Sequence, residues 1–170
     1  RKRGPDYLSI KSYKGYTICH QRLSIVGLDK KFNQPYLHKN LILLFNGEIY
    51  NFREIAKDCN LTKNAYKSDT ACLAELINKI GFNSSIKLID GMYSICVIDK
   101  SSNSISICVD DFGIKQLYFT KINNNIIIAS TFYPLLKILK QSNYKITLDN
   151  TTKIWKSSFH GLPPEHTHIE

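Results

Sequence analysis

The short apolar run at residues 41–45 constrains the fold most strongly, because no position in it is polar. A run of this length and composition predicts a strand that is buried on both faces. Such a strand needs a layer of structure packed on each side of its sheet. Asn46 and Gly47 follow the run directly, and an isolated Asn-Gly pair is typical of a turn. The sequence therefore predicts that the strand ends at this pair.

Asn46 and Gly47 also allow a second interpretation, in which they belong to a catalytic site. At the end of a buried strand, the side-chain amide of Asn46 and the backbone N–H of Gly47 would lie side by side. Two such donors can stabilise an oxyanion. The pair alone does not decide between the turn and the catalytic site.

Strand and helix patterns along the rest of the chain predict an α+β fold. Apolar residues at helical spacing predict helices at residues 51–59, 69–80, 84–90 and 132–139. Alternating or continuous apolar runs predict strands at residues 16–21, 41–45, 92–98, 104–109, 117–120, 126–129 and 145–148. Most of these strands follow one another as hairpins. Helices packed on antiparallel sheets, in layers, are the expected architecture.

Composition narrows the classes of function. The net charge is +9, but only four of the 23 basic residues are Arg and the lysines are scattered, so we predict no nucleic-acid partner. No run approaches the ~18 apolar residues of a membrane span, and we expect a cytoplasmic protein without membrane contact. Five cysteines without a C-x-x-C pair indicate neither a disulfide framework nor a zinc site.

Six blocks of residues occur here in the order in which one known family has them. With these blocks the chain resembles the glutaminase domain of glutamine-dependent asparagine synthetases, a class II amidotransferase of the N-terminal-nucleophile kind. Six ordered blocks are far more specific than any one of them. The blocks are Arg3-Gly4-Pro5-Asp6, His20-Gln21-Arg22-Leu23-Ser24-Ile25, Phe45-Asn46-Gly47-Glu48-Ile49-Tyr50-Asn51, Ser68-Asp69-Thr70, Asp90-Gly91-Met92-Tyr93 and Asp111-Phe112-Gly113-Ile114-Lys115-Gln116-Leu117-Tyr118.

The resemblance implies a four-layer αββα sandwich of two antiparallel sheets, of which residues 1–170 would lack the first strand and helix. Residues 1–150 would form the glutaminase domain. Residues 151–170 would form a linker and the start of an ATP-dependent synthetase domain. ATP and Mg²⁺ would belong to that second domain, with no cofactor or metal in the first. L-glutamine and the synthetase domain would be the partners, and a homodimer is left open.

The resemblance also assigns roles to single residues. Arg22 would pair with the α-carboxylate of glutamine, for which a planar guanidinium is well suited. Asp69 would bind the α-ammonium group of the substrate. Asn46 and Gly47 would form the oxyanion hole over the tetrahedral intermediate.

Three further residues are expected at the same pocket. Glu48 lies next to the oxyanion donors in the sequence and would help to hold the substrate. Backbone groups of Ile25 and Val26 would line the pocket, although a place in a core strand explains these two residues equally well. One cation, one anion and one oxyanion site are what recognition of a free amino acid and hydrolysis of its side-chain amide require.

The nucleophile that the resemblance implies is a cysteine at the first position of the mature protein, with its own α-amino group as base. All five cysteines of residues 1–170 are internal, and we assign this role to none of them. We therefore expect these residues to be part of a longer chain and not to hydrolyse glutamine by themselves. Two alternatives stay open: an inactive glutamine-sensing or structural module, and an amidotransferase of the same family with another carboxylate acceptor.

Overall fold

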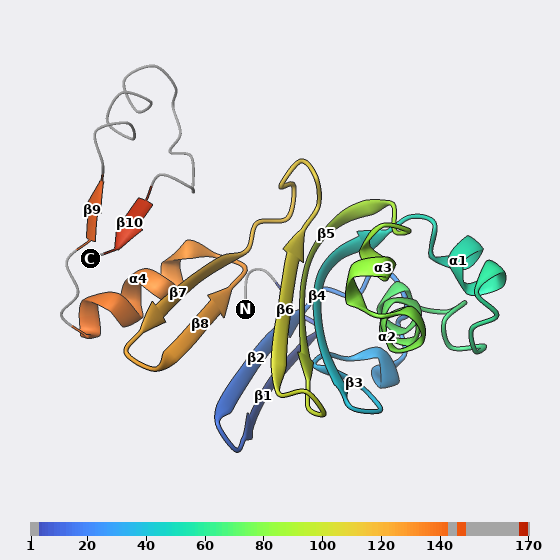
Figure 1. Ribbon diagram of the computed structural model, residues 1–170, viewed down its shortest axis with the longest axis horizontal. Helices are drawn as coiled ribbons and strands as arrows, with labels where there is room; N and C mark the ends of the chain where they lie inside the picture. The colour runs from blue at the N-terminus through green and yellow to red at the C-terminus, as the bar shows by residue number, and fades with distance from the viewer. Residues whose placement is uncertain (1–3, 143–145, 149–166, 170) are drawn as a thin grey trace. The chain divides into compact units, whose positions relative to one another are not determined.

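The computed structural model describes residues 4–142, 146–148 and 167–169 (Figure 1). Contacts within the chain divide it into two units, Arg1–Leu117 and Tyr118–Glu170, which are described separately. The predicted start of a second domain at residues 151–170 lies outside the described residues, except for residues 167–169.

The first unit is built on a four-stranded antiparallel sheet with the order β3-β4-β5-β6. Its strands are β3 (Tyr36–His38), β4 (Leu41–Ile49), β5 (Gly91–Asp99) and β6 (Ser104–Val109). β4 and β5 pair over their whole length, from Leu41 opposite Asp99 to Ile49 opposite Gly91. The apolar run at residues 41–45 therefore lies in a central strand, as its lack of polar positions predicts.

Helices cover one face of this sheet. α1 (Phe52–Asp58), α2 (Asp69–Ile80) and α3 (Phe82–Ile86) lie on the same side of it (Figure 1). Leu43 and Phe45 of β4 are buried with Leu73 and Leu76 of α2 in the main hydrophobic core. The apolar spacing that predicts α1 and α2 thus marks the helix faces that pack on the sheet.

A hairpin of β1 (Tyr7–Tyr13) and β2 (Tyr16–Arg22) covers the other face. Ile18 of β2 is buried in a second cluster with Ile42 and Ile98 of the sheet. Because successive residues of a strand point to opposite faces, the even-numbered positions of β4, including Asn46, face the hairpin. The first unit therefore has three layers: helices, sheet and hairpin.

The predicted end of the strand at Asn46 is wrong. β4 continues to Ile49, with Gly47 opposite Tyr93 and Glu48 opposite Met92. Pairing with β5 holds these residues extended, and this tertiary context overrides the turn tendency of an isolated Asn-Gly pair. The site residues of this segment are therefore held by a sheet.

Other elements differ from the sequence predictions in position or are absent from them. The short helix predicted at residues 84–90 is α3, which starts directly after Gly81 and spans Phe82–Ile86. β1 is not predicted from the sequence, because Leu8 and Ile10 are exposed in it and Ser9 between them is buried. β3 is not predicted either, since it has only three residues and is defined by its pairing with β4.

The second unit contains a hairpin, a helix and a short strand pair. β7 (Tyr118–Ile122) and β8 (Asn125–Ala129) form the hairpin, and Leu135 and Leu139 of α4 (Phe132–Gln141) are buried with Ile122. β9 (Ile146–Leu148) pairs with β10 (Thr167–Ile169). The hairpin, the helix and the strand β9 confirm the sequence predictions for this region. No helix in the described ranges has the length and apolar character needed to cross a bilayer.

Candidate active site

A cavity of about 270 Å³ lies in the first unit, lined by residues of β2, β4 and the first turn of α2. This volume is close to the lower end of the roughly 300–1,000 Å³ that is common for small-molecule sites. The structure brings all seven predicted site residues to this cavity, although they come from three separate stretches of the chain. They are Arg22, Ile25, Val26, Asn46, Gly47, Glu48 and Asp69.

Gln34, which the sequence analysis does not identify, fixes the part of β4 that leads into the cavity. Its side-chain amide donates to the carbonyl of Phe45 (2.8 Å) and accepts from the N–H of Phe45 (2.6 Å). The side chain of Gln34, two residues before the start of β3, thus makes the two hydrogen bonds to Phe45 that the backbone of a neighbouring strand would otherwise make. The backbone groups of Phe45 consequently point away from β5.

The backbone N–H of Gly47 points the same way as that of Phe45, because hydrogen-bonding directions repeat every second residue along a strand. On the opposite side, Tyr93 directs both of its backbone groups toward Asp110: its carbonyl accepts from the Asp110 N–H (2.8 Å), and its N–H donates to the Asp110 carboxylate (3.1 Å). The Gly47–Tyr93 pair is therefore a non-hydrogen-bonded pair. The Gly47 N–H is left available at the cavity, which both Gly47 and Asn46 line.

Position 47 requires glycine for two reasons. Its φ of +151° is rarely adopted by other residues. A Cβ atom at this position would lie 2.0 Å from the carbonyl oxygen of Met92. Glycine therefore allows β4 to approach β5 closely and leaves the cavity side of the strand as bare backbone.

Asp69 is the first residue of α2 and is only 4% exposed to solvent. The helix cap is the neighbouring Ser68, whose hydroxyl accepts from the Ala71 N–H (3.4 Å). The Asp69 carboxylate accepts from the backbone N–H groups of Thr70 (2.7 Å) and Ile49 (3.4 Å). Burial raises the pKa of Asp69, these two hydrogen bonds oppose the increase, and the charge of Glu48 adds to it.

Arg22 ends β2 and is 7% exposed. Its terminal nitrogens donate to Asn33 Oδ1 (2.7 Å), to the carbonyls of Val26 (3.1 Å) and Gly27, and at a long 3.5 Å to that of Asp29. Burial lowers the pKa of Arg22, and the carboxylates of Asp69 and Asp6 oppose this shift. Arg22 thus organises the loop that carries Ile25 and Val26, and its pairing with a substrate stays a prediction.

His20 is a second cavity residue that the sequence analysis does not identify. It lies two residues before Arg22 on β2, and therefore on the same face of the strand, which is a signal the sequence contains. Its buried Nδ1 atom has no hydrogen-bond partner among the described residues. Burial lowers the pKa of His20 to about 4, the Phe45 backbone acts in the opposite direction, and the charge of Arg22 lowers it further. The imidazole is therefore neutral at pH 7.

Lys115, from the segment after β6, also lines the cavity and is, after Gln34 and His20, the third lining residue that was not identified from the sequence. Together with Arg22, Asp69 and Glu48 it gives the cavity two cationic and two anionic side chains. These four groups form no ion pair within 4 Å with one another; across the described part of the chain the one ion pair is Lys31–Asp29 on the surface. Charges of both signs are therefore open to a ligand that carries both.

No cysteine lines this cavity. Burial raises the pKa of Cys72 to about 12 and those of Cys96 and Cys108 to about 11, so these thiols stay protonated and unreactive near neutral pH. Cys19 is exposed and Cys59 is half-buried, and neither belongs to the cavity. Our assignment of the nucleophile to none of these five cysteines stays a prediction.

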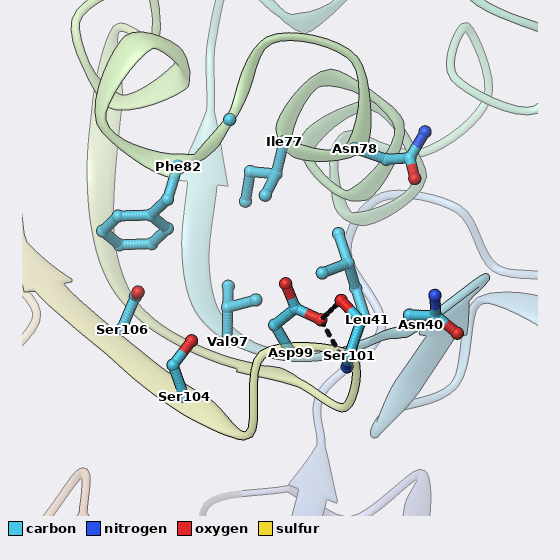
Figure 2. Close-up of a pocket in the computed structure, with 11 residues that line it drawn as sticks. Asn40, Leu41, Ile77, Asn78, Phe82, Val97, Asp99, Ser101, Ser104 and Ser106 are labelled. Carbon is cyan, nitrogen blue, oxygen red and sulfur yellow. Dashed lines mark hydrogen bonds between the residues drawn. The ribbon is translucent and has the colours of Figure 1, made fainter.

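A larger cavity of about 330 Å³ lies at the other end of β4 and β5 (Figure 2). Leu41, Ile77, Val97 and Phe82 contribute apolar side chains to it, and its one carboxylate is that of Asp99. This carboxylate accepts from the N–H (2.8 Å) and the hydroxyl (2.6 Å) of Ser101, as the dashed lines in Figure 2 show. Because it holds a single charged group, this cavity lacks the opposed charges of the smaller one.

Residues 1–168 match the family model described as "Glutamine amidotransferase domain". The chain is 33% identical over 165 residues to "Asparagine synthetase [glutamine-hydrolyzing] 2" of Bacillus subtilis, covering 91% of this chain and 21% of that protein. It is 33% identical over 120 residues to "Asparagine synthetase [glutamine-hydrolyzing]" of Brassica oleracea, and this match covers 69% of this chain and 20% of that protein. The chain spans between a fifth and a third of the length of such curated relatives.

A solved structure supports the fold. It is the glutamine phosphoribosylpyrophosphate amidotransferase from B. subtilis, determined in complex with ADP and GMP. The TM-score is 0.54 at 21% sequence identity, and the match covers 67% of this chain and 27% of that one. This likeness confirms the N-terminal-nucleophile hydrolase fold that the resemblance implies.

Proposed function

Because the chain belongs to the family of glutamine amidotransferase domains and is related to glutamine-hydrolysing asparagine synthetases, we propose that it binds L-glutamine in the cavity around Asp69. The domain hydrolyses the side-chain amide and supplies ammonia for ATP-dependent synthesis of asparagine from aspartate. Residues 1–150 carry the glutaminase part, and residues 151–170 lead toward the synthetase domain, which uses ATP and Mg²⁺. The protein works in the cytoplasm.

One observation carries this proposal: unpaired charges of both signs share a cavity with two adjacent hydrogen-bond donors. Asp69 is a buried carboxylate without a cationic partner within 4 Å in the described structure, and it suits the α-ammonium group of an amino acid. The cationic side of the cavity suits the α-carboxylate. Asn46 and Gly47 then receive the side-chain amide at the far end of the substrate.

The two donors act on the oxygen of that amide. When a thiolate attacks the amide carbon, the carbonyl oxygen gains the negative charge, and the Asn46 amide and the Gly47 N–H stabilise it. The α-amino group of the N-terminal cysteine, which took up the proton of the thiol, returns that proton to the amide nitrogen. Collapse of the intermediate then breaks the C–N bond, releases ammonia and leaves a thioester. Water then hydrolyses the thioester to glutamate and frees the thiol. The thiolate comes from an N-terminal cysteine, as the resemblance implies, since no cysteine of residues 1–170 lines the cavity.

The sheet supports this chemistry by keeping the donors in place before the substrate arrives. Gln34 holds Phe45, and the close approach of β4 to β5 at Gly47 fixes the following residue pair. Donors that do not have to reorganise during the reaction stabilise a developing charge most effectively.

The test is to measure both nitrogen sources in the full-length protein. Substitution of Asn46→Ala should lower the rate of glutamate formation from L-glutamine by about 10²- to 10³-fold. Ammonia-dependent asparagine formation should keep its rate, because it bypasses the cavity. Equal losses with glutamine and with ammonia would show that Asn46 is structural, and wild-type protein without glutaminase activity would overturn the proposed hydrolysis.

A further inference from the structure

The larger cavity, at the other end of β4 and β5, has polar side chains where a covered sheet face usually carries apolar ones (Figure 2). Asp99 pairs with Leu41 on one side and with Ser104 on the other, and Ser106 pairs with Val97. Residues that pair across strands point to the same face of a sheet, so these polar side chains share the face on which Leu41 and Val97 join the main core. A carboxylate and two hydroxyls at such positions break the apolar pattern, which is typical of functional sites.

The two oxygens of the Asp99 carboxylate differ in their hydrogen bonds. The N–H (2.8 Å) and the hydroxyl (2.6 Å) of Ser101 both donate to Oδ1. Figure 2 shows the other oxygen without a hydrogen bond to the residues drawn and directed toward the side of the cavity that Ile77 lines. The hydrogen bonds from Ser101 hold the pKa of Asp99 below its usual 3.8, so the carboxylate is ionised at neutral pH. A negatively charged oxygen therefore faces the cavity.

The cavity is negatively charged, although the chain has a net charge of +9. Among the described residues that line it, none is cationic, and Asp99 has no cationic partner within 4 Å in the described part of the chain. The C-terminal end of α2, at Asn78 and Gly81, forms part of the lining. This end of a helix carries a partial negative charge and favours cations. The charge of the cavity therefore suits a cationic ligand.

The rest of the lining adds an apolar wall and a further acceptor. Leu41, Ile77 and Val97 are buried, and Phe82 at the start of α3 contributes an aromatic ring. The hydroxyl of Ser106 makes no hydrogen bond with any described residue and can accept one from a ligand. A ligand that matches this lining combines a cationic head with a short apolar body.

We propose that this cavity is a second ligand site, which binds a small primary amine in its ammonium form on a short aliphatic stem. The ammonium group pairs with the second oxygen of Asp99 and donates to Ser106, while the stem packs on Ile77 and Val97. An ammonium group can donate up to three hydrogen bonds and accepts none, so it matches an ionised carboxylate, which only accepts. The volume of about 330 Å³ lies within the range common for small-molecule sites. This site lies away from the oxyanion donors and does not depend on the proposed hydrolysis.

The experiment measures binding of pentan-1-amine to the full-length protein by calorimetric titration and by saturation-transfer NMR of the ligand. The amine should bind with a Kd on the order of 1 mM, and pentan-1-ol and pentanoate, which have the same number of carbons, should bind about 10-fold more weakly or not at all. Asp99→Asn should weaken binding of the amine by about 5- to 10-fold, because it removes the charge but keeps an oxygen that can accept from Ser101. Asp58→Asn, at the exposed end of α1, is the matched control and should bind the amine as the wild type does.

A second variant keeps the test open if Asp99→Asn does not fold. Ser106→Leu fills the cavity without a change of charge and should abolish binding of the amine, so wild-type affinity in this variant would refute the site. Equal binding of amine and alcohol would show that the charge is not recognised, and no binding of the amine to the wild type would overturn the proposal. A loss of binding in Asp69→Asn but not in Asp99→Asn would place the amine in the smaller cavity instead. These titrations involve no turnover, so failure of the proposed hydrolysis would leave their result unchanged.

Discussion

Gln34 hydrogen-bonds to both backbone groups of Phe45, with its amide nitrogen 2.8 Å from the carbonyl oxygen and its amide oxygen 2.6 Å from the backbone nitrogen. A side chain therefore continues the pairing of β4 where β3 has ended. Gly47 follows two residues later on the same edge, and its N–H has no such cover. The geometry of the oxyanion donors thus depends on a glutamine from a different segment of the chain.

Substitution of Gln34→Leu should destabilise the protein and impair catalysis. The buried N–H and C=O of Phe45 would lose their partners, which costs about 1–3 kcal/mol in the free energy of unfolding. Urea denaturation should detect this loss, and kcat for glutamine should fall because the following donors are less well held. Gln141→Leu, at the exposed end of α4, is the control and should leave both quantities unchanged. Unaltered stability of the Gln34→Leu variant would contradict the role of this side chain.

The sequence predicts the secondary structure correctly where the local pattern of apolar residues agrees with the packing in the folded protein. The helical spacing before Gly81 predicts α2, and its apolar residues pack on the sheet as expected. Ordered blocks of residues, through a family resemblance, identify Arg22, Asn46 and Asp69 as neighbours in space, and the structure places all three at one cavity.

The remaining features depend on contacts that local pattern does not encode. β4 passes through Asn46 and Gly47 because β5 pairs with them, against the tendency of the dipeptide to turn. Gln34 and Lys115 reach the cavity from loops, where hydrophobic periodicity gives no signal. The loop contacts of Arg22 likewise follow from the folded path of residues 26–33 and not from the spacing of these residues in the sequence.

Substitution of Asp69→Asn should separate binding from stability. The KM for glutamine should rise by about 10- to 100-fold, because the α-ammonium group loses its anion. At neutral pH the variant should nevertheless be more stable than the wild type, since the raised pKa of Asp69 means that folding disfavours its charged form. The protonated carboxyl of Asp69 contributes fully to the stability of the folded state below pH 3.8, its ordinary pKa. This contribution is lost as the pH rises through the raised pKa of the folded state.

Thermal unfolding at several pH values tests this prediction for Asp69. The stability difference between variant and wild type should shrink as the pH is lowered toward 3.8. Asp58→Asn, at the exposed end of α1, controls for the loss of a surface charge. A variant that is less stable than the wild type at every pH would mean that the hydrogen bonds to Thr70 and Ile49 outweigh the cost of burying the charge.

Substitution of His20→Gln should remove part of the acid sensitivity of the protein. His20 has a pKa of about 4 in the folded state, against 6.5 ordinarily. The contribution of His20 to the free energy of unfolding is therefore complete above pH 6.5. Between pH 6.5 and 4 it falls by about 3 kcal/mol, because His20 is protonated in the unfolded state at a higher pH than in the folded state. Urea denaturation across this range should show a flatter profile of stability against pH for His20→Gln than for the wild type. Identical slopes for His20→Gln and the wild type would place the acid sensitivity in other groups.

Substitution of Gly47→Ala should be far more damaging than Gly15→Ala, although both glycines have positive φ angles. At Gly15 a Cβ atom would meet nothing within 4 Å, so the cost is that of the backbone conformation, about 1–2 kcal/mol. At Gly47 it would lie 2.0 Å from the Met92 carbonyl oxygen and force β4 away from β5. The difference in unfolding free energy between the two variants isolates this clash. The displaced strand should also carry the N–H of residue 47 out of reach of the substrate, so that any folded Gly47→Ala protein has lost glutaminase activity. A folded variant with wild-type kcat would refute the assignment of this N–H as an oxyanion donor.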